Sequence, residues 1–445
     1  MSRKPREWPA ARALPAPGTP PRSLLIRGAR VLDPASGFDG IAHVGIRDGL
    51  ISSIDTKPPK AAFEQTIDGK NRWLMPGIVD LCARFREPGQ THKASFASET
   101  PAAQAGGITT VVLPPDSRPV IDSPAALLRV QRIAAQVGGL DVRVLGALTQ
   151  DLGGEALAEL SALRSAGAVG ASQALQPIRD MLVARRALEY AHGLGMTVHV
   201  FAQNAALAAG GCAHESAVAT RLGLPAIPVA AEVSGIRFWI SLVEDTGARI
   251  HFCRLSTARG AELVALARQR GLPVTADVAA HQLFLTDADI DGFNALCHVM
   301  PPLRSREDRD ALRQAVADGV IGAICSDHQP HEADAKINPF PMTEPGISAL
   351  ETLLPLTLAL VHDGVLSALD AAARLTLGPA RIAGIDAGRL AVGAAADLVL
   401  VDPAQAWTLR ADYLRSAGRH TPFDGCAFTG CATTTLYRGE PVFVR

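Results

Sequence analysis

Two short segments carry the residues best suited to chemistry, and each follows an apolar, strand-like run. The first segment is "DLCARFREPG", in which Cys82, Arg84 and Arg86 alternate, and the second is "CSDHQPH", which contains Asp327 and His331. Alternate residues of a strand point to the same face, so Cys82 and Arg84 share one face. A cysteine thiolate can bind zinc, whereas a guanidinium is permanently charged and has no accessible lone pair. The first segment therefore combines a possible metal ligand with a side chain that repels a cation.

The segments that position these residues alternate between strand-like and helix-like patterns. Apolar runs rich in β-branched residues alternate with Ala- and Leu-rich amphipathic stretches; examples of the runs are "TTVVLPP", "VRVLGAL", "MTVHVFA", "ARIHFCRLS", "LPVTADVA" and "VIGAICSDH". Repeated strand and helix units of this kind predict a parallel sheet closed as a (β/α)8 barrel of the TIM type, in the α/β class. Function is then expected at the carboxyl ends of the strands.

Both ends of the chain have a different sequence pattern, without the alternation of strands and helices. Short apolar runs broken by turn residues predict β-hairpins in "SLLIRGARVLDPASGFDGIAHVGIRDGLISSID", and again in "GRLAVGAAADLVLVDP" and "TTTLYRGEPVFV". We predict that residues 23–75 and 386–445 build one small β-sandwich domain around a barrel of residues 76–385. The Pro- and Arg-rich residues 1–22 are predicted to form a flexible arm.

Composition narrows the class of function. The formal net charge is -1 and aromatic residues make up only 4% of the chain, which argues against nucleic-acid binding and base-stacking surfaces. No apolar run is long enough for a membrane span. The seven cysteines are odd in number and include no CxxC pair, so we expect reduced thiols in a cytoplasmic protein.

Several segments together resemble the dihydroorotase branch of the amidohydrolase superfamily. The similar segments are "LMPGIVDLCARFREPGQTHK", "AGGITTVVLPPDSRPVID", "RIHFCRLSTARGAELV", "AAHQLFLTD", "PPLRSREDRDAL", "AICSDHQPH", "PGISALETLLPL" and "GRLAVGAAADLVLVDP". The resemblance runs from about Ser23 to Arg445. It implies a barrel with a small β-sandwich, and metal-dependent hydrolysis of the cyclic amide of dihydroorotate or its closure from carbamoyl-aspartate.

The resemblance also implies where metal ligands belong, and most of them are missing. The family's His-x-His pair falls at Cys82 and Arg84, and two further ligand histidines fall at Phe201 and Arg254. An aspartate ligand expected around Ser172 to Ala174 is absent as well. Asp327, the catalytic position, is the one that survives, and we interpret it as vestigial. We hypothesise that Arg84 and Arg254 replace the charge of the metal and pair with Asp327. No metal cofactor is then expected.

Residues on the substrate side of the family's site are better retained. Arg86 matches the family's carboxylate-binding arginine, and His281 and His331 match positions that line the substrate pocket. Two polar positions are lost, because Pro115 replaces an asparagine and Met300 replaces another polar residue. The retained residues are compatible with a carboxylate site, although catalysis would still lack an activated water.

Three functions remain open at this point. The first is a non-catalytic dihydroorotase homologue that assembles with aspartate transcarbamoylase in pyrimidine synthesis, the partner being implied by the resemblance. The second is an active, metal-dependent cyclic amidohydrolase with a rebuilt zinc site, drawing on Asp327 with Cys82, His199, His251 or His331. The third is a binding module that senses an acidic pyrimidine intermediate. Core packing is the expectation for His251 and Cys253, and a homo-oligomer is expected from the resemblance.

Overall fold

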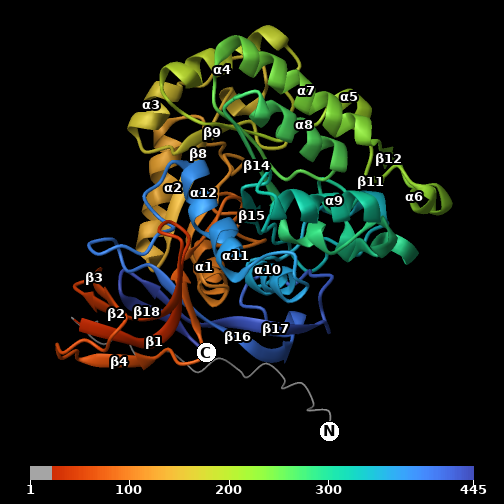
Figure 1. The fold of residues 1–445 in the computed structure, drawn as a ribbon. Helices are drawn as coiled ribbons and strands as arrows, with labels where there is room; N and C mark the ends of the chain where they lie inside the picture. The colour runs from red at the N-terminus through yellow and green to blue at the C-terminus, as the bar shows by residue number, and fades with distance from the viewer. Residues whose placement is uncertain (1–22) are drawn as a thin grey trace.

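The computed structural model describes residues 23–445, so the predicted flexible arm of residues 1–22 lies outside the described residues. Its larger part is a ring of parallel strands surrounded by helices (Figure 1). The strands follow one another around the ring in chain order: β6 (Ile78–Asp80), β7 (Ile108–Leu113), β8 (Asp141–Ala147), β9 (Gly170–Ser172), β10 (Val198–Val200), β13 (Ile250–Phe252), β14 (Val274–Ala279) and β15 (Ala323–Cys325).

The ring closes between its first and last strands, just beyond their carboxyl ends. Ala83 and His328 form a parallel bridge, and the backbone N–H of Arg84 donates to the carbonyl of His328 at 2.9 Å. This closure brings the "DLCARFREPG" and "CSDHQPH" segments together although they lie far apart in the sequence. The predicted α/β barrel is confirmed.

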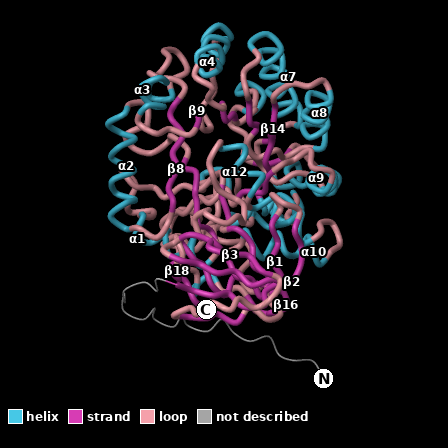
Figure 2. The backbone as a smooth tube through the Cα atoms, turned by 60° about the vertical axis from the view of Figure 1, so that its left-hand side comes forward, coloured by secondary structure: helices cyan, strands magenta, loops and turns pink. Residues whose placement is uncertain are grey.

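Helices cover the outside of the ring, as the amphipathic patterns predicted (Figure 2). In α2 the apolar residues Leu127, Val130 and Ala134 are buried on one face, and Pro124 occupies the first turn, where its missing N–H costs nothing. The helices are α1 (Phe96–Ala105), α2 (Pro124–Val137), α3 (Leu160–Ser165), α4 (Met181–Gly193), α5 (Ala205–Ala208), α6 (Ala217–Leu222), α7 (Val229–Thr246), α8 (Ala258–Gln269), α9 (Arg306–Ala317), α10 (Leu353–His362), α11 (Ala368–Leu375) and α12 (Leu377–Ala383). None of these helices is both long and apolar enough to cross a membrane.

Strands from both ends of the chain form a second sheet below the barrel (Figure 1). Its order is β18-β17-β16-β5-β1-β2-β3, with β4 paired to β1. Strand β5 from the N-terminal part pairs with β16 from the C-terminal part and includes Pro76, which is opposite Leu398. The terminal strands are β1 (Ser23–Asp33), β2 (Phe38–Arg47), β3 (Leu50–Asp55), β4 (Gln65–Asp68), β5 (Trp73–Pro76), β16 (Leu398–Thr408), β17 (Ala427–Tyr437) and β18 (Glu440–Val444).

A small parallel pair, β11 (Ala213–His214) and β12 (Ala226–Ile227), flanks α6 in the sequence. The main apolar core lies between the barrel strands and their helices. Strand β7, for example, is buried along its whole length, as expected for a parallel strand covered on both faces.

Candidate functional site

The residues singled out in the sequence lie at the carboxyl ends of the barrel strands. Arg86 follows β6, Arg254 follows β13 and Asp327 follows β15. All three have positive φ angles, of 61°, 55° and 47° respectively. Residues other than glycine rarely adopt this left-handed conformation, and it is typical of functional sites in which the backbone must aim a side chain. The strand ends therefore bend so as to present these side chains at the mouth of the barrel.

Arg84 and Arg254 both contact Asp327, as the charge-replacement hypothesis requires. Arg254 Nη1 is 3.0 Å from Asp327 Oδ1, and Arg84 Nη1 is 3.5 Å from the same oxygen. The three side chains are at most 4% exposed, so the two guanidiniums and the carboxylate form a buried ion cluster. Gln329 Nε2 donates a further hydrogen bond to Asp327 at 3.2 Å. Below, "the arginine cluster" means Arg84, Arg254 and Asp327.

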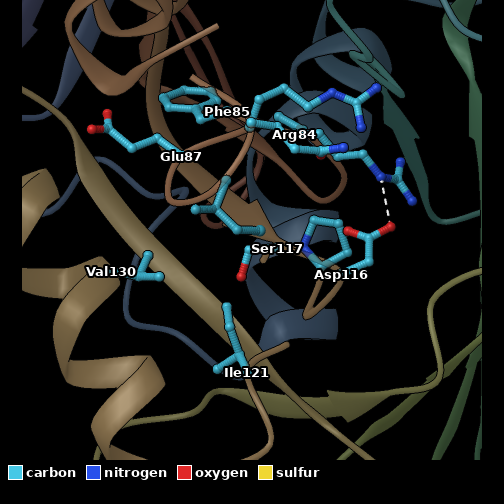
Figure 3. Close-up of a pocket in the computed structure, with 12 residues that line it drawn as sticks. Arg84, Phe85, Glu87, Asp116, Ser117, Ile121 and Val130 are labelled. Atoms are coloured by element: carbon cyan, nitrogen blue, oxygen red, sulfur yellow. Dashed lines mark hydrogen bonds and ion pairs between the residues drawn. The ribbon is translucent and has the colours of Figure 1, made fainter. Parts of the chain in front are cut away.

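A second carboxylate, which the sequence analysis did not identify, balances the arginine cluster. Arg84 Nε donates to Asp116 Oδ2 at 2.9 Å, and Figure 3 shows this contact as a dashed line in a small pocket at the barrel mouth. Asp116 directly follows Pro115 in "LPPDS", at the end of β7. The position of Asp116 shortly after a predicted strand was the one sequence feature that could have identified it as a site residue. With Asp116, two guanidiniums face two carboxylates.

Cys82 lies against the arginine cluster as a neutral thiol. Its Sγ atom is 2.9 Å from Arg254 Nη1 and 3.5 Å from Asp327 Oδ1. Burial raises the pKa of Cys82 to about 12, and Arg254 only partly offsets that effect. The thiol therefore stays protonated at neutral pH, accepting from the guanidinium and donating to the carboxylate.

The side chains at these positions do not fit the divalent ion that the resemblance implies. Arg84 and Arg254 offer no lone pair and repel a cation. Phe201 has no donor atom, and its ring instead packs against the Arg254 guanidinium at 5.2 Å, a cation–π contact. At the positions where the resemblance implies a metal, the arginine cluster instead provides fixed positive charge.

Two of the three predicted substrate residues lie together. Arg86 Nη2 is 3.1 Å from His331 Nε2, and Arg86 Nε donates to the Pro330 carbonyl. Lys93 Nζ, which the sequence analysis did not consider, is 3.2 Å from His331 Nδ1. Burial, together with Arg86 and Lys93, lowers the pKa of His331 to about 2. The imidazole is therefore neutral between two cations.

The third predicted substrate residue, His281, does not contact this group through any hydrogen bond. It is buried, and neither ring nitrogen has a hydrogen-bond partner within the described part of the chain. Burial lowers the pKa of His281 to about 4, against the raising effect of Asp327. His281 is thus a neutral polar side chain that is influenced electrostatically by the arginine cluster.

His328 belongs to a structural pair. Its Nδ1 atom accepts from the Ala349 backbone N–H at 3.0 Å, so its Nε2–H donates to Glu99 Oε2 at 2.9 Å. The other oxygen of Glu99 accepts from Ser98 Oγ and from the Ala417 N–H. Both residues are fully satisfied and buried, as core polar groups generally are.

The candidates for a rebuilt metal site do not converge on one point. Asp327 is part of the arginine cluster, and Cys82 contacts that cluster. His331 lies elsewhere, between Arg86 and Lys93. His199 and His251 instead lie deeper in the barrel, where one ring nitrogen of each is within 4.8 Å of the other and of Cys253 Sγ.

Comparison with known proteins agrees with this architecture. The amidohydrolase family model matches residues 73–442. The chain is 48% identical to a dihydroorotase-like protein of Pseudomonas aeruginosa over 94% of this chain and 99% of the relative. It is 42% identical to a dihydroorotase of Anaeromyxobacter dehalogenans over 94% of this chain and 97% of the relative.

A solved structure shows the same fold over nearly the whole chain. The L-hydantoinase (dihydropyrimidinase) from Arthrobacter aurescens superposes with a TM-score of 0.86 at 25% identity, covering 95% of this chain and 96% of that one. The chain therefore belongs to the amidohydrolase family, in which it is similar to dihydroorotases and dihydroorotase-like proteins.

Proposed function

We propose that this chain is a non-catalytic member of the dihydroorotase branch. The observation that carries the proposal is the arginine cluster, in which Arg84 and Arg254 both contact Oδ1 of Asp327. Hydrolysis of a cyclic amide in this branch depends on a water activated by a metal. Without a metal-activated water, Asp327 has no nucleophile to deprotonate as a general base. Engaged by two guanidiniums, it serves as a structural ion-pair partner.

We further propose that the chain works by assembly with aspartate transcarbamoylase in the cytoplasm. The barrel and the terminal sheet are complete despite the changed site, which supports a role that requires the fold rather than the chemistry. The family resemblance supplies the partner, and the near full-length likeness to a dihydroorotase-like protein supports the branch. The reduced state of the cysteines in the structure is compatible with a cytoplasmic location.

Assembly and turnover are tested on the same preparation. The full chain is mixed with aspartate transcarbamoylase from the same organism, and the mass of the eluted species is measured by size exclusion with light scattering. We expect one complex that contains both chains, and no hydrolysis of dihydroorotate by the free chain. Separate elution would contradict the assembly, and turnover would contradict the loss of catalysis.

The binding of an acidic small molecule is a second candidate, favoured by the environment of Arg86. Among residues 23–445, no carboxylate lies within ion-pair distance of Arg86, and its other contacts are the Pro330 carbonyl and the His331 ring. Burial lowers the pKa of Arg86 to about 10, which leaves it charged at pH 7. A half-buried, charged guanidinium without a carboxylate is suited to the carboxylate of a ligand.

Thermal denaturation with increasing concentrations of carbamoyl-aspartate or dihydroorotate tests this candidate. A ligand of the folded state raises the melting temperature in a concentration-dependent way. The shift is expected to disappear in Arg86→Gln and to persist in Arg129→Gln, a change of an exposed arginine on α2. No shift in the unmodified chain, or an equal shift in both variants, would contradict this role for Arg86.

A further inference from the structure

The barrel interior contains a cluster of potential metal ligands that neither the ion pair nor the proposed function uses. His199 on β10 and His251 on β13 are direct neighbours across the two strands, and their ring centroids are 5.0 Å apart. Cys253 follows His251 just beyond the end of β13. One nitrogen of each ring and the sulfur of Cys253 all lie within 4.8 Å of one another.

The positions differ from those at which the family resemblance places metal. His199 precedes Phe201 by two residues and His251 precedes Arg254 by three, so both histidines lie further inside the barrel than the arginine cluster. His199 and His251 are at most 1% exposed. Cys253 is only half-buried and lines a small pocket together with Phe201 and Arg254.

His199 is available as a ligand. Its Nε2 atom is buried and has no hydrogen-bond partner within the described residues. A buried polar atom without a partner carries a desolvation cost, which a bound ion would remove. Burial and the neighbouring His251 lower the pKa of His199 to about 3, so the ring is neutral and keeps a free lone pair at neutral pH.

His251 is already held in the way that metal-bound histidines usually are. Its Nε2 atom is 2.9 Å from Asp277 Oδ2, and the other oxygen of Asp277 accepts from the Arg254 backbone N–H. A carboxylate on one ring nitrogen fixes the tautomer and directs the other nitrogen to a metal. That other nitrogen, Nδ1, now faces the Thr275 hydroxyl at 2.9 Å, which an ion would displace.

The donor set selects the class of ion. Two imidazoles and a thiolate suit zinc and other borderline-soft cations, whereas magnesium and calcium require oxygen ligands. Coordination deprotonates a thiol even where burial disfavours the thiolate. The charges of a Cys253 thiolate and of Asp277 would together balance those of one divalent ion.

We propose that His199, His251 and Cys253 bind one zinc ion inside the barrel, with a structural role. The ion would tie β10 to the end of β13 and add its binding free energy to the stability of the barrel. This site is independent of catalysis, and it goes beyond the proposed function.

Zinc content of the full chain and of cysteine variants tests the proposal. After loading with zinc chloride and gel filtration, we expect about one equivalent in the unmodified chain and less than about a tenth in Cys253→Ser. Cys82→Ser at the arginine cluster and Cys426→Ser at an exposed position are the matched controls and are expected to retain the ion. With cobalt(II) as the probe, a thiolate-to-cobalt absorption band is expected to vanish in Cys253→Ser alone.

Two results would overturn the proposal. The first is an unmodified chain that binds no zinc, and the second is a Cys253→Ser variant that retains it. If that retained zinc is lost in Cys82→Ser, the ion lies at the family positions. Far-ultraviolet circular dichroism on each variant separates loss of the ligand from loss of the fold. Neither result by itself decides the proposed function, which is judged by turnover and assembly.

Discussion

Two buried ionic groups lie side by side where the barrel closes, and they differ in how well their polar atoms are satisfied. In the Glu99–His328 pair, both ring nitrogens and both carboxylate oxygens have partners. In the arginine cluster, Arg84 Nη2 and Arg254 Nε are buried without hydrogen-bond partners among the described residues. Arg254 and Asp327 also have positive φ angles, whereas His328 does not.

Under the proposed function, the difference separates residues that stabilise the barrel from residues at the position of a former binding site. A buried pair with all its hydrogen bonds formed and with no positive φ angle at His328 is what we expect of residues that only stabilise the fold. A strained backbone with incompletely satisfied side chains is typical of a site shaped for a ligand. The arginine cluster therefore combines a strained backbone with side chains that do not suit a metal.

Breaking the satisfied pair is expected to have the largest effect. His328→Ala leaves Glu99 buried without its main partner, and we expect it to lower the free energy of unfolding by about 3–5 kcal/mol. Urea denaturation at pH 7 measures this loss. A loss below about 1 kcal/mol would mean that the pair is not structural.

The pH dependence of stability tests the contribution of the Glu99–His328 pair in a second way. Burial alone would raise the pKa of Glu99, but the hydrogen bonds that its carboxylate accepts from His328 and from the Ala417 N–H outweigh that effect, so the pKa lies below its usual value. A carboxyl with a lowered pKa in the folded state stabilises the protein above its unfolded pKa, and this contribution is lost as the pH falls. Stability is thus expected to fall below about pH 4.5, and less steeply in Glu99→Gln.

The loss of stability on breaking the arginine cluster is expected to depend on whether one residue or all three are replaced. Asp327→Ala leaves the buried Arg254 without its ion-pair partner and Arg84 with Asp116 alone, at an expected cost of about 3 kcal/mol. Replacing all three residues with apolar ones, as Arg84→Met, Asp327→Leu and Arg254→Met, is expected to cost less than about 1 kcal/mol. Equal losses in the two variants would show that the cluster is held by more than its charges.

The smallest effect is expected at Cys82. Its thiol makes only weak hydrogen bonds to the arginine cluster, and Cys82→Ser preserves a donor and an acceptor in nearly the same place. We expect a change of less than about 1 kcal/mol in the free energy of unfolding. A loss several times larger would indicate that the sulfur has a role beyond these contacts.

The barrel could be predicted from the sequence because strand and helix periodicities repeat through its middle. The arginine cluster could be predicted because Arg84 and Arg254 fall at positions where the resemblance implies metal ligands, while Asp327 is retained. It did not predict Asp116 as the partner of Arg84, since the reach of that side chain depends on how the loop after β7 turns at Pro115. Lys93 beside His331 was missed for a similar reason. The convergence of His199, His251 and Cys253 depends on strand register, which spacing within one segment does not determine.

Turnover of dihydroorotate is the most direct test of the central claim, that guanidiniums have replaced the catalytic metal. The full chain, purified without chelator, is assayed in buffer supplemented with zinc, beside Asp327→Asn and a blank. The arginine cluster predicts that the unmodified chain, the variant and the blank give the same rate. Turnover above the blank that is lost in Asp327→Asn would contradict the claim and show that Asp327 is catalytic.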